Sequence, residues 1–206
     1  MALRGRIRWI ITVFVIAIFL SVTACTTKHI REVNPVIDNP PTVEVVPVTI
    51  GVYYPHEFVS YESRWGDAWI FPVGKGSVAL FDKVLPLMFK NVEHLKIRPD
   101  SGHNSQKIQG VLIPAIEAIA YNMKGWGYGV EITYQLQLFS MNGQTVASWK
   151  VKGTGVRKFG FDYLTHATPI GQVTEFAMQD AAINFMIIFE EDAAVKKWLN
   201  SLDGEQ

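Results

Sequence analysis

The clearest pattern in the chain is an alternation of apolar and polar residues over two neighbouring stretches, 129–139 and 144–153. In the first, every second residue from Val130 to Leu138 is apolar, and the residues between them are Glu, Thr, Gln and Gln. This period of two predicts strands with one buried and one exposed face. Asn142-Gly143, between the stretches, is a pair that tight β-hairpin turns favour. We therefore expect a long hairpin whose apolar face packs on helices.

Apolar residues recur at helical spacing elsewhere in the chain. Residues 172–190 carry the strongest such pattern, and we expect this helix to bury Phe176, Phe185 and Phe189 against the hairpin. Residues 193–202 predict a second amphipathic, turn-rich piece. A further helix is expected over residues 77–91, with Ser77 as its N-cap and Pro86 kinking or shortening it.

Stretches rich in β-branched residues predict strands at 45–54 and 92–97. Residues 110–121 are ambiguous between strand and helix, and Pro114 in their middle favours a strand. We expect extended chain or a strand at 57–64, mostly loop at 65–76 and an exposed loop at 98–106. This order of elements predicts an α+β fold. It would be a single domain over residues 44–206, with an antiparallel-rich sheet and helices mainly on one face.

The N-terminus has the layout of a secretory signal over residues 1–24. Three arginines precede an apolar stretch from Trp9 to Leu20, and small residues follow before Cys25. Val-Thr-Ala-Cys at this point resembles the bacterial lipobox, which implies that Cys25 receives a lipid and becomes the N-terminal residue. Two alternatives stay open: an uncleaved membrane helix, and an ordinary cysteine after a plain signal peptide.

The stretch after Cys25 is polar and rich in proline up to about residue 43. It predicts a lipidated, flexible tether over residues 25–43, which could lift the domain roughly 50 Å from a bilayer. In enterobacterial lipoproteins, Asp after the cysteine favours retention in the inner membrane. Here that residue is Thr26, so the resemblance implies the periplasmic leaflet of the outer membrane, with the inner membrane as the alternative.

Charge and cysteine content narrow the possible functions. Without residues 1–24, the chain has 16 Lys and Arg against 19 Asp and Glu. This balance predicts no nucleic-acid partner and no basic face for anionic lipid. Cys25 is the only cysteine, which excludes an intramolecular disulfide and a thiolate metal cluster. The fold must therefore rest on the burial of apolar side chains.

No motif for catalysis, metal or cofactor binding stands out. The chain lacks G-x-S-x-G and H-E-x-x-H, and its five histidines are scattered. Gly74-Lys75-Gly76-Ser77 lacks the spacing of a phosphate-binding loop, so we expect a loop and a helix cap there. We expect a protein that is not an enzyme and that needs no cofactor.

Large aromatic residues lie in glycine-rich stretches: Trp65 and Trp69 flank Gly66-Asp67, while Trp126 and Tyr128 lie between glycines. Tryptophan and tyrosine are favoured anchors of interfaces. These four residues are candidate contacts to a protein partner or a neighbouring subunit. The alternative is that their rings fold back and close the edge of the core.

Four segments carry a resemblance to a known group of proteins: VTIGVYY, GSVALFDKVLPLMF, the hairpin EITYQLQLFSMNGQTVASWKVKG and FAMQDAAINFMIIF. In their order along the chain and in their local sequence, they resemble small periplasmic domains like the N-terminal domain of TolB. Similar domains occur in the curli secretion lipoprotein, in the Pel polysaccharide lipoprotein and in uncharacterised proteobacterial lipoproteins. The resemblance implies an envelope lipoprotein but assigns no site residue.

Together, these observations predict a non-enzymatic binding or assembly module of the bacterial envelope, held to a membrane through lipidated Cys25. Its partners would be envelope proteins or copies of itself. The alternative is a lipid- or solute-binding accessory to an envelope transporter, which would need an apolar pocket between sheet and helices.

Overall fold

A computed structural model of the chain describes residues 28–98, 107–123, 127–158 and 167–203. Its elements, in chain order, are β1 (His29–Ile30), β2 (Val46–Tyr53), α2 (His56–Val59), β3 (Ser63–Trp65), β4 (Trp69–Phe71), α3 (Val73–Met88), β5 (Phe89–Leu95), β6 (Gly110–Met123), β7 (Gly127–Ser140), β8 (Thr145–Lys158), α4 (Ala167–Glu191) and α5 (Ala193–Asp203). In the parts of the chain just given, no helix is both long and apolar enough to cross a membrane.

The main sheet has five strands in the order β5-β2-β6-β7-β8. Strands β6, β7 and β8 are antiparallel neighbours, whereas β2 runs parallel to both β5 and β6. The sheet is therefore mixed, with its long strands antiparallel. The predicted hairpin is confirmed as β7 and β8, and Gly143 in its turn has a φ of 79°, a conformation that favours glycine. The strand prediction at 110–121 is also confirmed.

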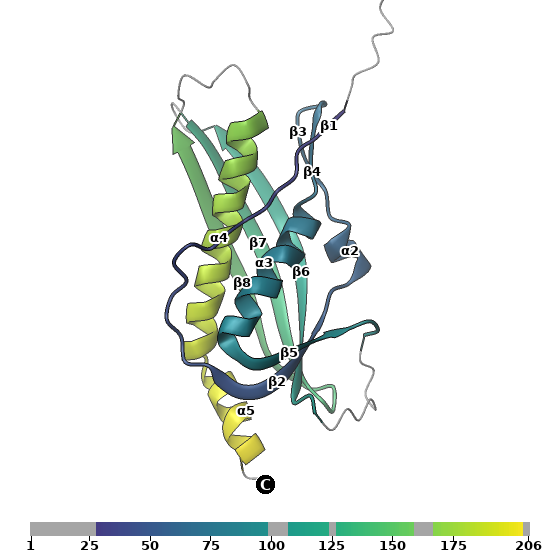
Figure 1. Ribbon diagram of the computed structural model, residues 1–206, viewed down its shortest axis with the longest axis vertical. Coiled ribbons are helices and arrows are strands. Elements are labelled where there is room, and N and C mark those ends of the chain that lie inside the picture. The colour runs from purple at the N-terminus through teal and green to yellow at the C-terminus, as the bar shows by residue number, and fades with distance from the viewer. Residues whose placement is uncertain (1–27, 99–106, 124–126, 159–166, 204–206) are drawn as a thin grey trace, which may run out of the picture.

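Helices α3 and α4 lie side by side across one face of the sheet, as Figure 1 shows. The alternating apolar residues of β7, from Val130 to Leu138, are buried beneath them. Aromatic rings fill the space between the layers: Tyr134 and Phe185 both pack edge-on against Phe81. The predicted α+β domain with helices mainly on one face is confirmed, and its core lies between these two layers.

The region before α3 differs from the prediction. Helix α3 begins at Val73 rather than after Ser77, and Ser77 is a buried residue inside it. Gly74 and Gly76 predict a loop from the sequence, but in the structure they let the α3 backbone pack closely against its neighbours. A Cβ added at Gly74 would lie 2.1 Å from the Phe58 carbonyl oxygen. Residues 57–71 form the short elements α2, β3 and β4 instead of one extended segment and a loop.

The segment 28–43 packs along the domain, so the prediction of a flexible tether is wrong there. β1 pairs with β4, and Val33 is 6% exposed within the core. The Asn34 backbone N–H donates to the Glu175 carboxylate (2.9 Å), and the Gln179 amide donates to the Val36 carbonyl (2.5 Å). Figure 1 shows this segment crossing α4 on its way from β1 to β2. We call residues 28–43 the strap. Its sequence predicts a tether because few of its residues are apolar.

Candidate functional site

Aromatic side chains from five strands, β1, β3, β4, β6 and β7, pack against one another. Figure 1 shows β1, β3 and β4 together at one end of the domain. The Trp65 ring packs against Tyr121 and Tyr128, with centroid distances of 5.4 and 6.4 Å. The Trp69 ring lies 4.8 Å from the ring of His29. We call these five residues the aromatic end. It forms because the turn at Gly66 (φ 58°) places Trp65 directly opposite Trp69 in the β3–β4 pair.

The structure treats the four aromatic candidates differently. Tyr128 is 5% exposed and belongs to the core. Trp65 and Trp69 are partly exposed and pack against the edge of the core. Trp126 lies outside the described residues. A role as contact residues stays a prediction, and Trp65 and Trp69 are the members that present ring surface to the outside.

Tyr121 brings a polar group into this aromatic setting. Its hydroxyl is buried and makes no hydrogen bond of ordinary geometry among the described residues. Burial raises the pKa of Tyr121, and the nearby hydroxyls of Ser63 and Thr174 oppose that rise. The phenol therefore stays protonated at neutral pH and acts as packing rather than as a base.

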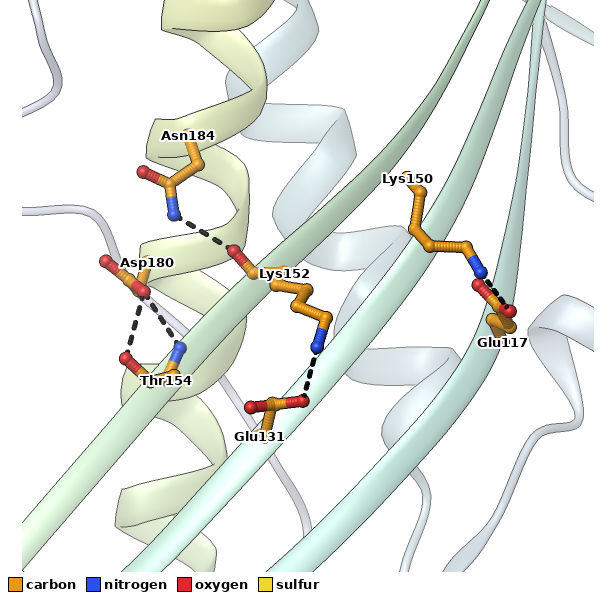
Figure 2. A network of polar contacts seen from close by, with 7 residues as sticks. All are labelled: Glu117, Glu131, Lys150, Lys152, Thr154, Asp180 and Asn184. Atoms are coloured by element: carbon orange, nitrogen blue, oxygen red, sulfur yellow. Dashed lines mark hydrogen bonds and ion pairs between the residues drawn. The ribbon is translucent and has the colours of Figure 1, made fainter.

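On β7 and β8, the face of the sheet away from α3 and α4 carries mostly polar side chains, among them Glu131, Lys150 and Lys152 (Figure 2). Lys150 contacts Glu117 at 2.6 Å and Lys152 contacts Glu131 at 3.0 Å, each pair joining neighbouring or next-neighbouring strands. All four residues are at least partly exposed, so the pairs add little to stability. In the described part of the chain, α3 and α4 lie on the other face of the sheet and leave these charges exposed (Figure 1).

Helix α4 closes the outer edge of β8. The Asp180 carboxylate accepts a hydrogen bond from the Thr154 backbone N–H (2.8 Å), and the Asn184 amide donates to the Lys152 carbonyl (2.9 Å), as Figure 2 shows. An added Cβ at Gly153 would lie 2.0 Å from the Ala177 carbonyl oxygen, so the helix backbone lies almost on the strand. These contacts occupy edge groups that could otherwise pair with another chain.

His94 lies next to a carboxylate from another element, a contact that no local sequence pattern indicates. His94 on β5 is 3.5 Å from Asp82 on α3, and the Tyr54 hydroxyl donates to the same Asp82 oxygen at 2.7 Å. Burial, together with Asp82, raises the pKa of Tyr54. Only tertiary packing brings these three residues together.

Two hollows lie away from the aromatic end. A groove of about 990 Å³ separates the β7–β8 turn from α5, with Asn142, Lys197 and Trp198 among its walls. A smaller cavity of about 170 Å³ lies between the end of the strap and the helices α4 and α5, with Val46, Met186 and Phe189 in its lining. The smaller cavity also touches Met88 at the end of α3. In the part of the chain that the structure covers, no group of three metal-ligating side chains comes together.

Comparison with protein-family models and with curated proteins gives no match. Solved structures offer distant likenesses. A lipoprotein candidate from Caulobacter crescentus is 10% identical with a TM-score of 0.41, over 76% of this chain and 92% of that chain. The PelC dodecamer from Paraburkholderia phytofirmans is 15% identical with a TM-score of 0.39, over 70% and 92%. A minor lipoprotein from Acinetobacter baumannii is 9% identical with a TM-score of 0.38, over 71% and 94%.

Proteins described as lipoproteins are thus among the structural neighbours. At these identities and TM-scores, the likenesses neither place the chain in a family nor assign it a function. The resemblance to the TolB domain stays a prediction from the sequence.

Proposed function

We propose that the chain is a lipoprotein of the bacterial envelope, anchored through Cys25, whose domain binds other proteins and does not catalyse a reaction. The observation that carries this proposal is the arrangement before Cys25. A cationic start, twelve residues from Trp9 to Leu20 that are apolar apart from Thr12, and Val22-Thr23-Ala24 lead directly to the only cysteine. Several acyl chains on one cysteine give lasting attachment to a bilayer.

The domain supports binding of macromolecules better than binding of a small apolar ligand. Packed rings such as Phe81, Tyr134 and Phe185 fill the layer between sheet and helices. The apolar cavity beside the strap, at about 170 Å³, is smaller than usual ligand pockets of 300 Å³ or more. The exposed face of β7 and β8, with its Lys–Glu pairs, offers a surface for a protein partner.

A second candidate function is the accessory to an envelope transporter, and the open groove beside α5 is the observation in its favour. Native mass spectrometry of the protein purified from its membrane separates the two proposals. Ser201→Trp narrows the groove, so loss of a bound lipid or solute in this variant would support the transporter accessory. A protein that carries no ligand and crosslinks to a protein partner would support the binding module.

The anchor can be tested directly. Mass spectrometry of the mature protein should show an N-terminal cysteine that carries acyl chains. Cys25→Ala should leave the signal uncleaved at this site and abolish acylation. Thr27→Ala is the matched control and should be acylated and cleaved like the natural chain. A mature N-terminus that starts elsewhere and lacks lipid would contradict the proposal.

The same preparation tests the location. We propose the periplasmic leaflet of the outer membrane because Thr26 follows the cysteine. In density-gradient fractionation the natural chain should travel with outer-membrane markers, and Thr26→Asp should move it to the inner membrane. Thr27→Asp, with the same charge one position later, is the control.

A further inference from the structure

The strap determines where the chain enters the domain. β1 runs parallel to β4, with His29 opposite Trp69, and the His29 backbone N–H donates to the Ala68 carbonyl at 2.7 Å. The first described residue, Lys28, therefore lies beside the turn between β3 and β4. This turn belongs to the aromatic end, and α5 lies at the other end of the molecule (Figure 1).

The distance from this entry point to Cys25 is short. Three peptide units separate Cys25 from Lys28, and consecutive Cα atoms are 3.8 Å apart. The two Cα atoms are therefore within about 11 Å of each other, whatever path the chain takes. The strap cannot lengthen this distance by detaching freely, because it is fixed to the domain. It is held by the pairing of β1, by buried Val33 and by the hydrogen bonds to Glu175 and Gln179.

The chemistry of the aromatic end suits a lipid surface. Trp65 and Trp69 present partly exposed rings, and tryptophan favours the boundary between headgroups and acyl chains. Among the described residues of β1, the start of the strap, β3, β4 and the end of β8, four exposed basic residues stand against three exposed acidic ones, Glu32, Glu62 and Asp67. The basic residues are Lys28, Arg31, Arg64 and Lys158.

This local excess of positive charge contrasts with the chain after the signal, in which acidic residues outnumber basic ones. The excess is one charge among the described residues, so it adds to the attraction of the tryptophans for a bilayer and does not form a basic face by itself. Lysine and arginine close to a bilayer are attracted by anionic headgroups within about one Debye length.

We propose that the aromatic end rests on the headgroups of the membrane that holds Cys25, with the groove beside α5 facing away from it. The proposal rests on the lipid anchor of the proposed function. It assigns Trp65 and Trp69 to lipid rather than to a protein partner. Proteins would then bind the polar face of the sheet or the far end of the domain.

The test uses the full, acylated protein in vesicles of phosphatidylethanolamine and phosphatidylglycerol. Asp67→Cys in the β3–β4 turn and Asn200→Cys on α5 each add one free thiol, because Cys25 is blocked by lipid. Both positions are exposed. A fluorophore on each thiol is exposed to lipids that carry a quencher near the headgroup. Quenching at position 67 should exceed that at position 200 several-fold.

Charge reversal provides a second readout. In the chain labelled at position 67, Arg64→Glu with Lys158→Glu should reduce quenching at least twofold. Raised salt should have the same effect on the labelled chain without these two changes. Lys83→Glu with Lys196→Glu is the matched control at exposed sites of α3 and α5, and should leave quenching unchanged.

The possible failures are distinguishable. Protein that is acylated and vesicle-bound, but equally quenched at both positions or more at position 200, would overturn the orientation while the anchor stands. An unquenched label at position 67 that crosslinks to a protein or to a second copy would assign this end to that partner instead. Protein without acyl chains would overturn the anchor and the orientation together.

Discussion

The phenylalanines of α4 show how far a helical pattern determines burial at single positions. Phe185 is fully buried, and its ring packs edge-on against Trp149 and Phe189. Phe176 was predicted to be buried with it, but it is 46% exposed. Residues spaced by four, from Val173 to Phe189, form the row that faces the sheet, and Phe176 lies beside this row. The prediction is right for Phe185 and Phe189 and wrong for Phe176.

A pair of substitutions tests this difference. Phe185→Ala removes a ring from a filled core and should lower the free energy of unfolding by about 3–5 kcal/mol. Phe176→Ala removes the same atoms from a half-exposed site and should cost less than about 1 kcal/mol. Urea unfolding of the two variants and the natural chain measures both values. Equal losses would show that the orientation of α4 is wrong.

At the scale of elements, the sequence predicts best those helices and strands whose signals lie within their own residues. The hairpin carries its own signals, alternation and Asn142-Gly143, and it forms as expected. The start of α3 was placed wrongly because Gly74 and Gly76 are there for contact with α2 and the strap, which no local window reveals. The sheet of β1, β4 and β3 also escaped prediction, since β1 comes from a distant segment.

The contact between α4 and β8 is an element-scale feature that can be tested at one glycine. Gly153→Ala would place a Cβ 2.0 Å from the Ala177 carbonyl oxygen, so helix and strand must separate. We expect a loss of about 2 kcal/mol or more, in the range typical of overpacked cores. Gly129→Ala on β7 is the control: its added Cβ meets no atom closer than 3.5 Å, so thermal unfolding should change little. An unaffected Gly153→Ala variant would contradict this packing.

At the scale of the whole molecule, the strap bears on how the domain would stand relative to the proposed anchor at Cys25. A flexible tether would let the domain move roughly 50 Å from the bilayer and turn freely. If Cys25 carries the proposed lipid, a packed strap places the end with β1 and β4 near the membrane, because only three peptide units separate Cys25 from Lys28. Composition could not distinguish these cases, because polar segments with proline pack when single residues such as Val33 find a place in the core.

Removing the strap tests whether it belongs to the domain. A chain that begins at Glu44 should unfold at lower urea than one that begins at Lys28. It loses the buried Val33 side chain, worth roughly 1.5–3 kcal/mol, and the pairing of β1 with β4. The ordering entropy of the strap offsets part of this loss, so we expect a net difference of about 2 kcal/mol. Val36→Ala, at an exposed strap position, is the control and should leave the midpoint unchanged. Equal midpoints for the two chain lengths would mean that the strap is a tether after all, and the orientation at the membrane would lose its physical basis.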